Sequence, residues 1–265
     1  MRYTIPLLFL LFFFSVQSCK DSGINSGASV TCLPANLQNG LVAAYTFGGG
    51  SLTDATLGGH DLSQSGLATP TTDRAGNASC AYNITNGAGT TSVLTNTQTS
   101  FLNGMSDFTI SIWYKPEGAR DGGDFEGLLS RGNQGRCPDR RGEWSVSLYD
   151  CRRAVFAHNN SVWADLISQP SSDLCQDEMN NITGKWQHVV AVKEGDELRI
   201  YFNGILNDTA SGVANCSTST HLAQDTGDLF LGLDYNGALD DILIYKRALS
   251  AQEISELYGL EACCN

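Results

Sequence analysis

The chain has 265 residues and a formal net charge of −12; 42 % of its residues are hydrophobic and 17 % are charged. The hydrophobic fraction is that of a globular protein and excludes an intrinsically disordered chain. The acidic balance argues against nucleic acid as a partner, because binding phosphate groups requires a net basic surface.

The first residues predict an export signal. Arg2 precedes an apolar run, residues 5–14, that is too short to span a bilayer. Val16 and Ser18 suit cleavage by an ordinary signal peptidase, so we expect a signal peptide over residues 1–18. Plain secretion is one outcome of such a signal.

Cys19 gives the second outcome, because its position resembles the lipobox of bacterial lipoproteins, in which this cysteine carries the lipid. Lipidation would leave eight of the nine cysteines, an even number for four disulfides in an oxidising compartment. We therefore expect a lipid anchor at Cys19, a polar tether over residues 19–38, and a location in the cell envelope, at the outer membrane or cell surface. A membrane contact is expected only through this anchor.

Short segments rich in β-branched and aromatic residues then recur at intervals of about ten residues, with turn residues between them. The Asn203-Gly204 pair is a strong signal for a hairpin turn. The pattern predicts an all-β sandwich over residues 39–265. The expected strands are 41–47, 81–85, 91–94, 108–115, 128–130, 144–149, 154–158, 186–192, 198–202, 205–206, 229–232 and 242–245.

One short helix is expected at the end of the domain. Ser250 and Glu253 have the spacing of a capping box, and apolar residues then recur at helical spacing up to Tyr258. Two acids, Asp240 and Asp241, stand directly before the last predicted strand.

Six segments together resemble the laminin-G-like domains of the concanavalin A-like lectin/glucanase superfamily. They occur in the order typical of that family and span about residues 41–258. The resemblance implies a jelly roll of two antiparallel sheets, and a role in binding sugars or proteins, often in adhesion. The segments are LVAAYTF (41–47), TDRAGNASCAY (72–82), FTISIWYKP (108–116), WQHVVAV (186–192), LRIYFNG (198–204) and LDDILIYKRALSAQEISELY (239–258).

The resemblance also implies that the two chain ends lie close together. Cys263 and Cys264 are therefore expected to bond to Cys32 and Cys80, in either order. The remaining cysteines give two further expected bonds, Cys137–Cys151 and Cys175–Cys216.

A structural calcium is a further implication of the resemblance. In related domains the acid at the position of Asp240 often helps to hold the ion, and Asp54 is a possible further ligand here. Strand alternation places the Asp240 side chain on the face of Ile242 and Ile244, toward the core, where a carboxylate needs a partner or a cation. The alternative is that Asp240 accepts backbone hydrogen bonds or pairs with an arginine such as Arg74.

Catalysis is not expected. The glycosidases of the superfamily place two or three acids on one strand, and neither Glu-x-Asp-x-x-Glu nor Glu-x-Asp-x-Glu occurs in this chain. The four histidines do not cluster, and His188 fits a structural role better than that of a base. An atypical glycoside hydrolase remains the second alternative.

Glycan recognition has two sets of candidates. Trp113, which faces away from the predicted core, and Trp163 are candidate platforms for a sugar ring, although a loop covering Trp113 is equally compatible with the sequence. The second set is an arginine-rich window whose guanidinium groups suit carboxylate or sulfate, with arginines paired inside the protein as the alternative. The window holds Arg131, Arg136, Arg140, Arg141, Arg152 and Arg153, and Arg136, Arg140 and Arg141 are its ligand candidates.

The sequence therefore predicts a non-catalytic, exported module that binds a glycan or an extracellular protein. A purely structural or protein-interaction domain without a sugar site is the first alternative.

Overall fold

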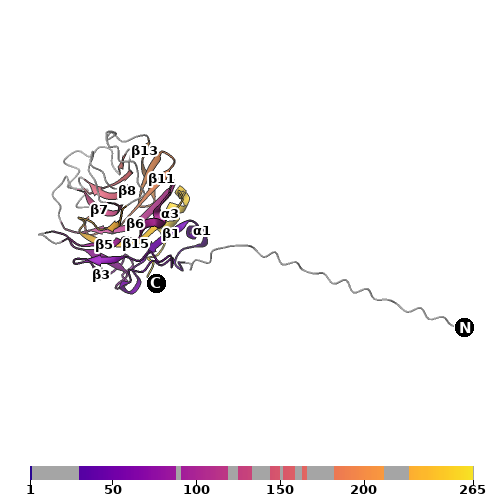
Figure 1. Ribbon diagram of the computed structural model, residues 1–265, viewed down its shortest axis with the longest axis horizontal. Coiled ribbons are helices and arrows are strands. Elements are labelled where there is room, and N and C mark those ends of the chain that lie inside the picture. Colours follow the sequence, from indigo (N-terminus) through magenta and orange to yellow (C-terminus); the bar gives the residue numbers. More distant parts are fainter. Residues whose placement is uncertain are drawn as a thin grey trace.

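Two antiparallel sheets pack face to face and form a jelly-roll sandwich, as predicted (Figure 1). The computed structural model describes residues 1, 30–87, 91–118, 125–132, 144–149, 152–158, 163–165, 182–211 and 227–264. Among these residues, none of the helices is long and apolar enough to cross a bilayer.

The eight-stranded sheet, called sheet A below, contains the central strand β15. This strand pairs with β6 on one edge, and with β4 and then β1 on the other. The order of sheet A is β13 (Ile205–Ser211), β12 (Glu197–Phe202), β11 (Gln187–Glu194), β6 (Phe108–Pro116), β15 (Gly237–Tyr245), β4 (Ala81–Ile84) and β3 (Thr69–Thr71), with β1 (Leu41–Tyr45) beside β15.

The seven-stranded sheet, sheet B, lies opposite. Two α-helices, α1 (Ala35–Gln38) and α3 (Ala251–Gly259), and two 3₁₀ turns, Gly48–Gly50 and Thr99–Leu102, complete the described elements. The order of sheet B is β10 (Trp163–Asp165), β9 (Arg153–His158), β8 (Trp144–Tyr149), β7 (Glu126–Arg131), β14 (Leu229–Leu231), β5 (Val93–Asn96) and β2 (Ser63–Ser65).

The main core fills the space between the sheets. Alternate residues of β6, such as Ile110 and Ile112, meet Val146 and Phe156 from sheet B, and all four are at most 1 % exposed. Burial of such apolar surface is the main favourable term in folding.

A second apolar layer covers the outer face of sheet A. Ile254 and Leu257 of α3 pack with Leu243 of β15 and with Leu37 of α1. The predicted capping box begins α3, since the Ser250 side chain accepts from the Glu253 amide and the Glu253 carboxylate accepts from the Ser250 amide.

The packed part of the chain begins earlier than the expected boundary at residue 39. Val30, Leu33 and Leu37 are buried in the second apolar layer, and Leu37 is fully inaccessible. Residues 30–38, which were expected in the tether, therefore belong to the folded domain.

A β-bulge in β15 overturns the predicted orientation of Asp240. Asp240 lies opposite Trp113 and Leu243 lies opposite Ser111, so two residues of β15 face the single Ile112 of β6. The extra residue changes the alternation, and Asp241 takes a left-handed φ of 41°. Because cross-strand partners share a face, Asp240 lies with Trp113 on the outer face, away from Ile242.

Candidate functional site

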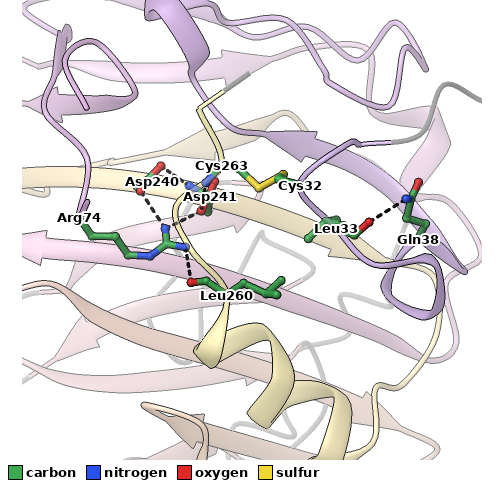
Figure 2. Close-up of a disulfide and its surroundings, with 8 residues drawn as sticks. All are labelled: Cys32, Leu33, Gln38, Arg74, Asp240, Asp241, Leu260 and Cys263. Atoms are coloured by element: carbon green, nitrogen blue, oxygen red, sulfur yellow. Dashed lines mark hydrogen bonds and ion pairs between the residues drawn. A yellow bond between two sulfur atoms is a disulfide. The ribbon is translucent and has the colours of Figure 1, made fainter. Parts of the chain in front are cut away.

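A buried arginine–aspartate cluster lies on the outer face of sheet A, between β15 and the C-terminal tail (Figure 2). Arg74 Nη1 is 3.0 Å from Asp240 Oδ2 and 2.5 Å from Asp241 Oδ2, and Arg74 Nη2 donates to the Leu260 carbonyl oxygen at 3.3 Å. The Cys263 amide also donates to Asp241 Oδ2. The cluster therefore joins the loop before β4, the bulge of β15 and the tail after α3.

Trp113 belongs to the same cluster and is not an open platform for a sugar. The Arg74 guanidinium lies 4.3 Å from the centre of its ring, and the rings of His188 and Tyr258 stack with it at 4.9 and 5.6 Å. Its side chain is consequently buried, with 9 % of the residue exposed. The sequence was compatible with either an exposed or a covered Trp113, and the structure shows it covered. The prediction of Trp113 as a ligand-binding residue is therefore wrong.

The two acids outnumber the cation that pairs with them. Burial raises the pKa of both carboxyl groups, and the charge of Asp241 raises the pKa of Asp240 further. Asp241 Oδ1 is buried and has no hydrogen-bond partner among the described residues. Asp241 also lines a small cavity, of about 10 Å³, together with Arg74, Ser111 and Trp113.

His188 lies beneath this cluster and is a neutral structural residue. Its Nε2 is 2.8 Å from Ser111 Oγ, and its backbone amide donates to Asn203 Oδ1. Burial, with a smaller contribution from Arg74, lowers the pKa of the imidazole to about 3. A base with so low a pKa is not protonated in the folded protein at moderate pH, which agrees with the structural role expected for it.

This lowered pKa predicts a loss of stability in acid. The unfolded chain binds a proton at His188 below about pH 6.5 while the folded chain does not, so stability is full above pH 6.5 and falls as the pH drops toward 3. At pH 5 the expected loss from this one residue is about 2 kcal/mol relative to pH 8. Urea unfolding at both pH values measures it. His188→Gln should remove that part of the pH dependence, and an unchanged dependence would contradict the assignment.

Two disulfides hold the C-terminal tail against the cluster. The structure joins Cys32 to Cys263 and Cys80 to Cys264, which resolves the two orders left open by the sequence. The other cysteines named above lie outside the described residues: Cys19, Cys137, Cys151, Cys175 and Cys216.

The arginine-rich window contains internal ion pairs and hydrogen bonds. Arg152 makes a two-point contact with Glu126, at 3.0 and 3.1 Å, and both residues are buried. Arg131 is 1 % exposed and donates to backbone oxygens of Thr99 and Leu102. These two arginines follow the internally paired alternative. The ligand candidates Arg136, Arg140 and Arg141 lie outside the described residues.

Apart from Trp163, sequence patterns missed the members of a row of residues on the outer face of sheet B. One residue from each of the seven strands stands opposite the next, and cross-strand partners share a face. Four members carry hydroxyl groups and two are aromatic, and Phe230, Thr95 and Ser145 are partly exposed. The cross-sheet row consists of Ser63, Thr95, Phe230, Ser130, Ser145, Ala157 and Trp163.

Comparison with known proteins places this fold in a family. A laminin G-type model of the concanavalin A-like lectin/glucanases superfamily matches residues 86–255, which is more than half of the chain. The chain belongs to this superfamily. A search of curated protein sequences found no match.

Solved structures share the laminin G-type fold at low sequence identity. The binding domain of Paraclostridial Mosquitocidal Protein 1 is 19 % identical, with a TM-score of 0.61 over 83 % of this chain and 52 % of that one. The receptor-binding domain of a botulinum neurotoxin C/D mosaic serotype is 13 % identical, with a TM-score of 0.58 over 83 % and 51 %. This chain therefore spans about half the length of these toxin domains.

Domain 4 of AbnA, an extracellular GH43 arabinanase from Geobacillus stearothermophilus, matches over nearly its full length. It is 18 % identical, with a TM-score of 0.56 over 82 % of this chain and 98 % of that domain, and its structure was solved with arabinotriose. At these identities the likeness shows the fold.

The expected calcium ligands do not fit a shared ion in this laminin G-type domain. Arg74 stands where a cation would neutralise Asp240. Asp54 Oδ1 accepts from the amides of Ala44 and Thr56, and no contact between described residues joins it to Asp240. Both acids therefore have structural hydrogen-bonding roles.

One further group has donor atoms close enough for an ion among the residues that the structure describes. It consists of Asp73, Cys80 and Cys264, and its two cysteines form a disulfide with each other. A disulfide removes the thiolates that a metal would need, so this group does not fit a metal site either.

Proposed function

We propose that this chain is a non-catalytic binding module that recognises a glycan on the outer face of sheet B. The cross-sheet row carries this proposal. The hydroxyl groups of Ser63, Thr95 and Ser145, which are exposed or partly exposed, suit sugar hydroxyls, and the partly exposed ring of Phe230 suits the apolar face of a sugar ring.

The structural neighbours support a binding role. They include the arabinanase domain solved with arabinotriose, and the binding domain of botulinum neurotoxin DC, solved in one structure with SialylT and in another with rat synaptotagmin II. The same fold thus serves both sugar and protein partners in other proteins. We place a glycan first here because the row is rich in hydroxyl groups, and an extracellular protein second.

The chemistry of the same face supports the absence of catalysis. Hydrolysis of a glycoside requires two carboxyl groups across the scissile bond. Among the strand residues with described side chains whose register places them on the outer face of sheet B, none is acidic. Reducing-sugar release from polysaccharides by the purified protein would contradict this part of the proposal.

Export and lipid anchoring at Cys19 complete the proposal, since the N-terminal sequence gives the domain a route to the cell surface. With the signal segment intact, Cys19→Ala should move the protein from the membrane fraction to the soluble fraction. A variant that stays membrane-bound would overturn the anchor.

Binding to a glycan array that holds neutral and acidic oligosaccharides, arabino-oligosaccharides included, tests the main proposal. We expect selective binding, and we expect Ser145→Trp to weaken it at least tenfold, because the new ring would occupy the row next to its central member, Ser130. Thr209→Trp adds the same bulk at an exposed position of β13 on sheet A and should bind like the wild type. Binding to no glycan, or full binding by Ser145→Trp, would overturn the sugar site.

A further inference from the structure

Oxygen atoms from three residues converge on the Arg74 guanidinium. Asp240 Oδ2, Asp241 Oδ2 and the Leu260 carbonyl oxygen lie 3.0, 2.5 and 3.3 Å from its nitrogens (Figure 2). A fourth oxygen, Asp241 Oδ1, is buried without a hydrogen-bond partner among the described residues. Carboxylate and carbonyl oxygens in such a group are the ligands that a hard divalent cation prefers.

The guanidinium is held in this position by its surroundings. Arg74 lies against the Trp113 ring, and its side chain is 10 % exposed. Asp73, the preceding residue, accepts from the amides of Ala75 and Asn77 and so fixes the loop that presents Arg74. The backbone amide of Asp241 donates to the Asp240 carboxylate, and the backbone amide of Cys263 donates to the Asp241 carboxylate. These two hydrogen bonds fix the positions of the carboxylates.

We infer that Arg74 acts as a built-in cation, which makes this domain independent of calcium at a position where oxygen ligands would otherwise hold a divalent ion. Without the guanidinium, Asp240, Asp241 and the Leu260 carbonyl form an uncompensated anionic group on the outer face of sheet A. Such a group binds Ca²⁺ in place of the lost positive charge. Arg74 therefore removes the need for a metal where the loop before β4, the bulge of β15 and the C-terminal tail meet.

Thermal unfolding in EDTA and in millimolar CaCl₂ tests the inference. The melting temperature of the wild-type protein should be the same in both. Arg74→Ala should melt roughly 5 °C lower than the wild type in EDTA, and Ca²⁺ should restore at least half of that loss. NaCl at equal ionic strength should not restore the melting temperature, because ions that only screen the carboxylates do not bind between them and replace the positive charge.

Two control variants separate this effect from a general effect of arginine loss. Arg74→Lys keeps a positive charge in the cluster and should show no calcium response. Arg199→Ala removes an arginine from Glu194 and Glu197, which are both exposed, and should likewise show none.

Two results would overturn the inference. The first is a wild-type protein whose melting temperature falls in EDTA. The second is an Arg74→Ala protein that folds but does not respond to Ca²⁺. If Arg74→Ala does not fold even with Ca²⁺, the inference is also rejected, because the ion then fails to replace the guanidinium.

Discussion

Replacing Cys32 and Cys263 with serine is expected to lower the free energy of unfolding by about 4 kcal/mol. A disulfide stabilises mainly by restricting the unfolded chain, and the effect grows with the size of the closed loop. Cys263 and Cys264 are adjacent, so while Cys80–Cys264 remains, the Cys32–Cys263 bond closes only a ring of roughly fifty residues. The small ring, and not the sequence separation of 231 residues, sets the loss.

The same reasoning predicts that the two disulfides have nearly equal effects when removed singly. Serine at Cys80 and Cys264 leaves Cys32–Cys263 to close the large loop, so again only the small ring is lost. A variant without both bonds should lose about 5 kcal/mol more, which is comparable to the whole stability of a typical domain. Urea unfolding of the three variants at neutral pH measures these differences.

A second readout reports on the N-terminal segment. Without Cys32–Cys263, residues 30–38 are held by the packing of Leu33 and Leu37 and by contacts such as that of Asn36 with Glu256. Limited proteolysis should then cut this segment in the Cys32/Cys263 variant before it does so in the Cys80/Cys264 variant. Single-bond losses below 1 kcal/mol, or losses that differ by more than 2 kcal/mol, would contradict the ring-size argument.

Composition and periodicity predicted an all-β sandwich because most strands carry enough β-branched and aromatic residues to show their period, and the family resemblance implied the jelly-roll topology. The Asn203-Gly204 turn was equally clear, and both residues take positive φ, 49° and 80°, as a type I′ turn requires. The missed strands, β2, β3 and β10, have three residues each, and two of them, β2 and β3, lack large apolar residues. β2 is Ser-Gln-Ser and β3 is Thr-Pro-Thr, so their pairing comes from the neighbouring strands and not from their own propensities.

The site was harder to predict because it depends on register. A single extra residue at Asp241 changes which face receives Asp240, and alternation counted along the sequence cannot show a bulge. Arg74 was named among the partners of Asp240, but its contact with Trp113 follows from the same change of face. The cross-sheet row is likewise a property of pairing: Ser63 and Ser145 are unremarkable until the strands between them are aligned.

Removing the guanidinium of Arg152 is expected to lower the free energy of unfolding by 3–5 kcal/mol, the range typical of a broken buried ion pair. Arg152 makes two hydrogen bonds to the Glu126 carboxylate, and it also donates to the carbonyl oxygens of Glu117 and Gly118 and to the Thr183 hydroxyl. Arg152→Ala therefore leaves a carboxylate buried at 1 % exposure without this cation. It also leaves two carbonyl groups without their donor.

A change in backbone strain at position 152 does not contribute to this expected loss. Arg152 has a φ of 59°, and alanine is no better suited to the left-handed region than arginine, so the strain there is nearly the same in both proteins. Arg199→Ala is the matched control, because its ion pairs with Glu194 and Glu197 involve carboxylates that are 59 % and 45 % exposed. That loss should be below 1 kcal/mol.

A double variant, Arg152→Met with Glu126→Leu, separates the ion pair from the other hydrogen bonds. If the ion pair alone stabilised this region, two apolar residues of similar volume would restore most of the stability. We expect only partial recovery, because Glu117, Gly118 and Thr183 still lack the donor that ties the end of β6 and the segment before β11 to β7. Urea unfolding of the single and double variants at pH 7 measures the contribution of the ion pair and that of the other hydrogen bonds of Arg152. Full recovery would show that the backbone hydrogen bonds of Arg152 contribute nothing, and a loss below 1 kcal/mol in Arg152→Ala would show that the pair is not buried in solution.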